Sequence, residues 1–238
     1  MKQDRRLFIK VVAGGLMLAG LPLAARAQAS GKTKIGVVGS GRVGSALGGV
    51  WVKKGHEVMF SSRNLENDKA LAAKLGPNAR AGTPREAAAF GEVLLVSVPY
   101  GSLPDVGKDL KELLKGKVVI DTCNPVPGRD GEIAEWARKK GAGIASAELL
   151  PGARLVRAFN AVGAGRMGSV HQEPGRVGMP IAGDDAKAIE AASRLIRDIG
   201  FEPVLVGGLA MGKYLMPGTP LAGEHTPAEI RKIAATLK

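Results

Sequence analysis

The segment KIGVVGSGRVGSALG, residues 34–48, constrains the fold more than any other part of this 238-residue chain. An apolar run of strand type, Lys34–Val38, leads into three glycines spaced as GxGxxG, and a helical pattern follows over Val43–Lys54. Such a strand–turn–helix unit binds the pyrophosphate of a dinucleotide on backbone N–H groups at the helix N-terminus. The residues expected to hold a dinucleotide are Gly39, Ser40, Gly41, Arg42, Val43 and Gly44.

Each glycine of this turn has its own expected role. Gly39 permits the tight turn, Gly41 lets the pyrophosphate approach the backbone, and Gly44 allows close packing of helix on strand. The alternative is a glycine turn that holds no ligand.

Strand-type and helix-type segments alternate along the rest of the chain. Further strands are expected at residues 56–61, 93–98, 118–121, 155–159, 178–182 and 203–206. Helices are expected at residues 65–75, 84–90, 102–114, 131–140, 186–199 and 227–237. Asn64 and Thr83 are predicted N-caps, the latter in a capping box with Glu86.

The apolar, non-alternating strands predict a parallel sheet that is buried on both faces. The fold class is therefore α/β, with a Rossmann-type doubly wound, mainly parallel sheet and helices on both faces. Residues 28–238 are expected to form a single NADP-binding domain with a short helical C-terminal tail.

The residues after the second predicted strand distinguish NAD from NADP. An NAD site places Asp or Glu there to accept the ribose 2′-hydroxyl, whereas this chain has Phe60-Ser61-Ser62-Arg63-Asn64. The hydroxyl groups of Ser61 and Ser62 and the guanidinium of Arg63 together predict a site for the 2′-phosphate of NADP(H). An ordinary polar turn is the alternative.

Three further strand ends should line the same cleft, because ligands bind outside the carboxyl ends of parallel strands. Val98-Pro99-Tyr100 is expected near the ribose. In Asn124-Pro125, the asparagine either bonds the nicotinamide carboxamide or caps a turn. Asn160 is expected to close the cleft.

The sequence shows no acid–base or nucleophile constellation and no metal-ligand spacing. His56, His171 and His225 are each expected at the surface, and Cys123 is expected to be a buried apolar side chain. We therefore expect no catalytic side chain and no metal. This suits hydride transfer between two bound rings, which depends mainly on proximity and orientation.

The first 27 residues have the features of an export signal. Arg5-Arg6 precede Phe8 and Lys10, an apolar stretch covers residues 11–25, and Ala25-Arg26-Ala27 is a small-x-small cleavage site. They predict a twin-arginine signal peptide and a periplasmic protein that meets the membrane only during export. Since this route moves folded proteins, a dinucleotide bound in the cytoplasm could travel with the chain. An uncleaved anchoring helix is the alternative.

The formal net charge of +12 fits several classes of anionic partner. The basic residues are dispersed and are not interleaved with aromatic side chains, so no nucleic-acid partner is expected. A small-molecule redox acceptor and a solvated basic surface account for the charge. A homodimer is compatible with the sequence.

Taken in order, the motifs resemble those of NADPH-dependent reductases of the deazaflavin coenzyme F-420. They also resemble the NADPH-binding domain of STEAP-type ferric reductases. The resemblance rests on the glycine-rich turn, Ser62-Arg63, Val98-Pro99, residues 121–125, residues 150–164 and residues 180–210.

This resemblance implies hydride transfer between NADP(H) and a flavin or deazaflavin ring. Carried over by position, Ser40–Val43 would hold the pyrophosphate, and Ser62 and Arg63 the 2′-phosphate. Met211 and residues 163–178 would border the second substrate.

Two other functions stay open from the sequence. One is a non-catalytic NADP-binding module or a partner of a membrane redox protein. The other is an imine or carbonyl reductase, which is disfavoured because no long all-helical substrate domain and no obvious proton donor are expected.

Overall fold

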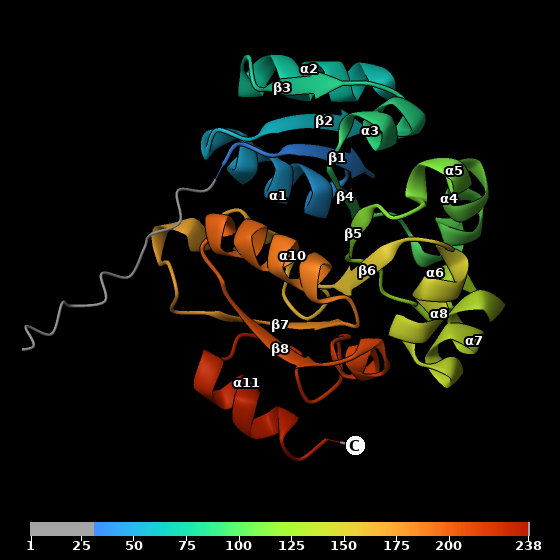
Figure 1. The fold of residues 1–238 in the computed structure, drawn as a ribbon, viewed down its shortest axis with the longest axis vertical. Coiled ribbons are helices and arrows are strands. Elements are labelled where there is room, and N and C mark those ends of the chain that lie inside the picture. The colour runs from blue at the N-terminus through green and yellow to red at the C-terminus, as the bar shows by residue number, and fades with distance from the viewer. Residues whose placement is uncertain (1–30, 238) are drawn as a thin grey trace, which may run out of the picture. The chain divides into compact units, whose positions relative to one another are not determined.

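A single sheet runs through the computed structural model, which describes residues 31–237. The strand order is β3-β2-β1-β4-β5-β6-β7-β8 (Figure 1). The strands are β1 Lys34–Val38, β2 Glu57–Ser61, β3 Ala79–Ala81, β4 Val93–Val96, β5 Val118–Asp121, β6 Arg154–Arg157, β7 Gly178–Gly183 and β8 Glu202–Gly207. The predicted signal peptide over residues 1–27 lies outside the described residues.

Helices connect most of the strands. They are α1 Arg42–Lys53, α2 Leu65–Leu75, α3 Pro84–Phe90, α4 Leu103–Asp109, α5 Lys111–Leu114, α6 Pro127–Asp130, α7 Glu132–Lys140, α8 Ala142–Leu149, α9 Ala164–Met167, α10 Ala186–Ile199 and α11 Pro227–Ala234. Short 3-10 helices are η1 Tyr100–Ser102, η2 Val170–Gln172 and η3 Leu209–Tyr214. None of the helices within residues 31–237 is both long and apolar enough to cross a membrane.

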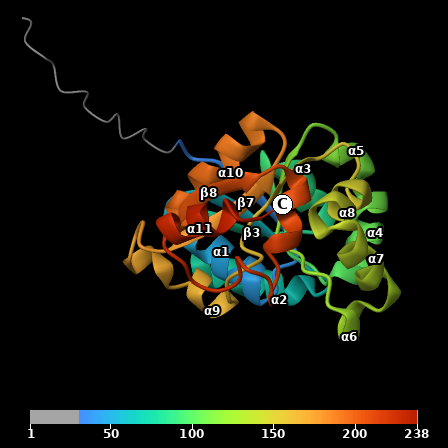
Figure 2. The same ribbon diagram turned by 90° about the horizontal axis from the view of Figure 1, so that it is seen from below.

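Apolar side chains of the sheet pack against helices on both faces. In β1, Val37 joins a cluster with α1 and α10, and the next residue, Val38, joins a second cluster with α4, α7 and α8. The latter three helices group together, apart from α1 and α10, in Figure 2. This arrangement confirms the doubly wound α/β fold.

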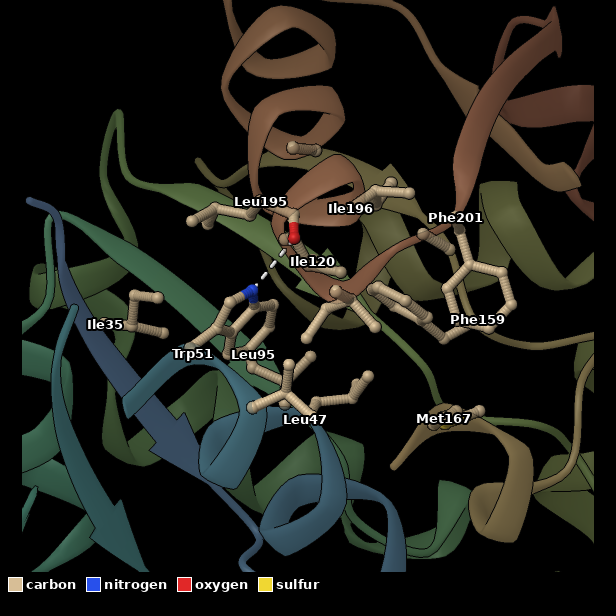
Figure 3. Packing of buried hydrophobic residues seen from close by; sticks show 14 of the residues in the cluster. Ile35, Leu47, Trp51, Leu95, Ile120, Phe159, Met167, Leu195, Ile196 and Phe201 are labelled. Carbon is tan, nitrogen blue, oxygen red and sulfur yellow. Dashed lines mark hydrogen bonds between the residues drawn. The ribbon is translucent and has the colours of Figure 1, made fainter. Parts of the chain in front are cut away.

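The cluster between α1 and α10 is organised around one aromatic residue. Trp51 of α1 is fully buried, and its Nε1 donates a hydrogen bond to the Leu195 carbonyl oxygen of α10 at 2.9 Å (Figure 3). Its ring meets Phe159 edge-on at 6.5 Å between centroids. Met167 of α9 belongs to the same cluster, so this short helix is anchored beside α1.

The strand directions agree with a mainly parallel sheet. β1 to β6 run parallel, whereas β7 is antiparallel to β6 and parallel to β8. The reversal follows from the connection after β6, which has only the short α9 and η2 and no full crossover helix.

Local signals place several helices correctly. α2 and α10 have the predicted bounds, the Asn64 side chain accepts from Asn67 N, and Thr83 and Glu86 form the predicted capping box. The single helix predicted over residues 102–114 is wrong: it is divided into η1, α4 and α5, because the backbone leaves the helical region at Leu110.

Candidate functional site

The glycine-rich turn lies where the strand order reverses, since β1 is flanked by β2 on one side and β4 on the other. Ligands of such sheets bind at this switch point. Gly39 has a φ of +101°, and a Cβ there would lie 2.2 Å from the Ser97 carbonyl oxygen. A Cβ on Gly44 would lie 2.1 Å from the Gly39 carbonyl oxygen. Both positions therefore require glycine for the turn itself.

The start of α1 is open and electropositive. Gly41 is its N-cap without a side-chain cap, and no atom lies within 4 Å of where a Cβ on Gly41 would be. The first turn holds no acidic residue, and Arg42 has no ion-pair partner among residues 31–237. Val43 packs inward against the core. Free N–H groups, positive dipole end and guanidinium together fit a pyrophosphate.

A pocket of about 400 Å³ opens beside this turn. Six predicted residues line it, from the turn and from the ends of β2 and β4: Gly39, Gly41, Ser62, Arg63, Val98 and Pro99. Residues that the sequence reasoning misses form the other wall, chiefly Pro84, Ser102, Asp105, Val106 and Asp109 of α3, η1 and α4, and Leu110 directly after α4. A mostly apolar slot with a few polar groups suits an adenosine moiety.

The first serine at the end of β2 holds the turn instead of lining the pocket. Ser61 is fully buried, and its hydroxyl donates to the Val37 carbonyl oxygen at 2.7 Å. The Ser61 carbonyl oxygen accepts from the N–H groups of Gly39 and Ser40 at 2.9 and 3.0 Å. The prediction of Ser61 as a phosphate ligand is therefore wrong, because its polar atoms already have partners inside the fold.

A buried carboxylate from α2 binds the other two serines of this region. Asp68 is 1% exposed and accepts hydrogen bonds from the hydroxyl groups of Ser40 and, at 2.8 Å, Ser62. Ser40 thus uses both its N–H and its hydroxyl within the protein, which corrects its prediction as a pyrophosphate ligand. The sequence reasoning missed Asp68, because no local pattern shows that α2 lies against the turn.

The predicted ligands at the ends of β5 and β6 form a buried network. Arg157 and Asp121 are both fully buried, with Nη1 and Oδ2 2.5 Å apart. Arg157 Nη2 also donates to the Cys123 carbonyl oxygen at 3.1 Å. Asn124 Nδ2 donates to the Asn160 carbonyl oxygen at 2.8 Å. These groups tie the end of β5 to the end of β6 and do not line the 400 Å³ pocket.

Asn124 makes this cross-strand bond, and its two predicted roles stay predictions. Asn160 is 3% exposed, and its Oδ1 is one of the buried side-chain atoms without a partner in the described chain. Pro125 is buried beside them. Asn124, Pro125 and Asn160 line neither the 400 Å³ pocket nor the pocket beside Arg42 and Gly165.

Tyr100 corrects a further prediction. Its side chain is fully buried, and its hydroxyl lies 3.2 Å from Ser146 Oγ of α8. Burial raises the pKa of Tyr100 to about 12. The tyrosine ring packs under α8 and cannot line the ribose side of the pocket.

Cys123 and His56 are both buried, one as predicted and one against prediction. Burial, with Asp121 nearby, raises the pKa of the Cys123 thiol, which stays neutral and apolar as expected. His56 is 2% exposed, because its ring accepts from the Thr33 N–H at 3.2 Å and lies 3.1 Å from Asp198. No group of three or more His, Cys, Asp or Glu within residues 31–237 is placed to hold a metal ion.

A second pocket of about 430 Å³ also borders the first turn of α1. Its lining residues are Arg42, Ser45, Ala164 and Gly165. The predicted border segment 163–178 therefore meets the glycine-rich turn through α9. Met211 lines neither pocket, because it packs in the apolar cluster of β8 and α11 around Val204 and Ile230.

Fold, turn and pocket define a dinucleotide-binding protein of the Rossmann class. Residues 34–125 match the family described as NADP oxidoreductase, coenzyme F420-dependent. The chain is 29% identical over 202 residues to the F420-dependent NADP reductase of Methanothermobacter marburgensis, covering 79% of this chain and 90% of that protein. These findings confirm the resemblance to NADP-dependent oxidoreductases and support NADP as the cofactor.

Two further comparisons extend this result. The chain is 30% identical over 183 residues to the metalloreductase STEAP3 of Rattus norvegicus, covering 76% of this chain. It spans only 35% of that protein's length. The solved structure of a hypothetical protein from Sinorhizobium meliloti is similar with a TM-score of 0.68 and 24% identity, covering 83% of this chain and 96% of that one. This last match supports the fold alone.

Proposed function

We propose that this chain binds NADPH at the carboxyl ends of β1, β2 and β4 and transfers hydride between it and a flavin-like or deazaflavin ring. The observation that carries the proposal is a pair of pockets sharing the start of α1. Gly41 and Arg63 both line the first pocket, and Arg42 and Gly165 both line the second. The relatives named as F420-dependent NADP reductase and metalloreductase support a redox role.

The residues present fit NADPH in three places. The free N–H groups of the first turn of α1, with Arg42, would hold the pyrophosphate. Arg63, which has no ion-pair partner among the described residues, would hold the 2′-phosphate. Val98, Val106 and Leu110 would pack on the adenine.

When bound, NADPH would supply a hydride from carbon 4 of its nicotinamide, and an acceptor ring would gain that hydride together with a proton from water. The protein's part is to bind and orient both rings, for which no acid or base side chain is needed. The pocket at Arg42, Ser45, Ala164 and Gly165 is the proposed place of the acceptor.

The 2′-phosphate assignment is tested by Arg63→Ala. Losing a charge-assisted contact should weaken NADPH binding by about 1.5–3 kcal/mol and leave NADH binding nearly unchanged. Fluorescence titration of both cofactors measures this. Arg194→Ala, an exposed arginine on α10 that lines neither pocket, is the matched control. Equal losses for NADPH and NADH would contradict the assignment.

The acceptor site is tested by filling the second pocket. A Cβ on Gly165 meets no atom within 4 Å, so Gly165→Leu fits without strain and occupies the space. We expect loss of NADPH oxidation with FMN, riboflavin or the deazaflavin coenzyme, and unchanged NADPH affinity. Gly163→Leu, equally unhindered but outside the lining, is the control. A wild-type protein that binds NADPH and reduces none of these acceptors would instead support the non-catalytic NADP-binding module.

We also propose export by the twin-arginine route, supported by the sequence of residues 1–27. Cell fractionation should find the protein in the periplasm and should find the double variant Arg5→Lys with Arg6→Lys in the cytoplasm. Wild-type protein confined to the cytoplasm would contradict export.

A further inference from the structure

Asp68 is a buried acid at the part of the pocket where a 2′-phosphate would bind. The side chain is 1% exposed, and its hydrogen-bond partners are two hydroxyl groups from separate segments. Ser40 belongs to the glycine-rich turn, and Ser62 follows β2 and lines the pocket. One carboxylate thus joins the two segments that would surround the adenosine ribose.

The protons of these two hydroxyl groups decide what the pocket offers. A serine hydroxyl has a single proton. Ser40 donates its proton to Asp68, and the Ser62 hydroxyl has two acceptors within the protein, Asp68 at 2.8 Å and the Asn64 carbonyl oxygen at 3.2 Å. Ser62 Oγ also accepts from the Asn64 N–H at 3.1 Å, so only a lone pair is left for a ligand. The ionised 2′-phosphate of NADPH has only acceptor oxygens and needs a donor. The ribose 2′-hydroxyl of NADH has a proton that it can donate to the Ser62 lone pair.

Arg63 and Asp68 therefore act in opposite directions on the same ligand atom. The guanidinium of Arg63 attracts the 2′-phosphate from an exposed position. The carboxylate of Asp68 withholds the Ser62 proton from it and places a negative charge behind that serine. The 2′-hydroxyl of NADH needs no donated proton and carries no charge, so Asp68 does not weaken its binding in either way.

We propose that Asp68 is a specificity-determining residue that limits the preference of this site for NADPH over NADH. The inference rests on the proposed function to the extent that the pocket holds a nicotinamide dinucleotide. Asp68 acts through Ser62, so it is a positioning residue, and its effect is on the ratio of the two affinities.

The direct test is Asp68→Asn, which keeps the size of the side chain and removes its charge. The amide has one acceptor oxygen and one donor nitrogen, so one serine must accept from it and has its own proton released. We expect NADPH to bind about tenfold more tightly, because the negative charge behind Ser62 is removed and the Ser62 proton, then held only by the longer contact with the Asn64 carbonyl oxygen, can turn to the phosphate. NADH affinity should stay nearly the same. Fluorescence titration of both cofactors measures the ratio.

Ser62→Ala identifies the route of the effect. In the wild-type background it should lower NADH affinity more than NADPH affinity, because the Ser62 oxygen can accept from a ribose 2′-hydroxyl while its proton is held inside the protein. In the Asp68→Asn background it should remove most of the gain. Should Asp68→Asn fold poorly, the single Ser62→Ala variant still tests the proposal, because a loss of NADPH affinity larger than the loss of NADH affinity would overturn it.

The outcomes separate this inference from the proposed function. Wild-type protein that binds NADPH while Asp68→Asn leaves the NADPH to NADH ratio unchanged overturns the role of Asp68 alone, and marks it as a purely structural link. Wild-type protein that binds neither dinucleotide contradicts the proposed function and overturns this inference with it.

Discussion

The strand ends of β1, β2 and β4 differ in construction from those of β5 and β6, although all five strands are parallel and end at the same edge of the sheet. The first group surrounds an open pocket with an exposed arginine, Arg63. The second group encloses a fully buried arginine, Arg157, paired with Asp121. One half of the edge is arranged to receive a ligand, and the other is closed on itself.

The difference lies in whether a polar side chain finds its partner inside the fold. Arg157 is met by Asp121 from the neighbouring strand and by the Cys123 carbonyl oxygen. Arg63 has no such partner among residues 31–237, so its charge is available to an anion. A polar residue after a strand is thus a ligand-binding residue only where the neighbouring strand end leaves it unpaired.

The largest expected effect comes from removing the buried ion pair between Arg157 and Asp121 at the ends of β5 and β6. Arg157→Met leaves Asp121 buried without its partner, which should lower the free energy of unfolding by about 3–5 kcal/mol. Urea unfolding measures the loss. Arg154→Met on the same strand removes a half-buried, bidentate ion pair with Asp185 and should cost much less stability. Similar losses in both variants would mean that burial does not separate the two arginines.

The second-largest expected effect distinguishes Gly39 from Gly41, two glycines of the turn beside the open pocket. At Gly39 the backbone is left-handed, and a Cβ would contact the Ser97 carbonyl oxygen. Gly39→Ala should therefore cost about 1–3 kcal/mol of stability. Gly41→Ala has free space around its Cβ and should fold normally, but the methyl group should weaken NADPH binding. Thermal unfolding and NADPH titration of both variants check this. A Gly41→Ala variant that binds NADPH like wild type would argue against a pyrophosphate at this turn.

The smallest expected effect concerns the reactivity of the Cys123 thiol. Cys123, the single cysteine of the chain, is 2% exposed, and burial raises the pKa of its thiol. Since the thiolate is the reactive form, we expect very slow reaction with a disulfide reagent in native protein and fast reaction after unfolding in urea. Fast modification of the folded protein would show that the β5–β6 half opens in solution.

The sequence predicts most elements of the first half of the fold correctly, because their signals depend on residues that lie close together in the chain. Helix caps such as Asn64 and the capping box of Thr83 and Glu86 depend on residues three positions apart. The three-residue strand β3 and the helix α8 carry no such signal. β3 is too short for periodicity, and α8 is packed against both α7 and η3, so it lacks a single apolar stripe.

The candidate site is only partly predictable for the same reason. Gly39, Gly41 and Gly44 are recognised from their spacing, and the structure agrees with the roles assigned to Gly39 and Gly44 in the turn. Ser61 and Tyr100 have the right chemistry and position in the chain, but both side chains point into the core. Asp68 is part of the site because α2 folds back onto the turn, which no local pattern shows.

The sequence alone determined the glycine turn, the α/β class and the helix caps, because each depends on backbone geometry over a few neighbouring residues. Only the tertiary structure decided which polar groups are available to a ligand. That depends on partners distant in the chain: Asp121 lies 36 residues from Arg157, and Asp68 lies 28 residues from Ser40. Most buried polar groups in proteins are hydrogen-bonded, and the fold alone brings their partners within reach.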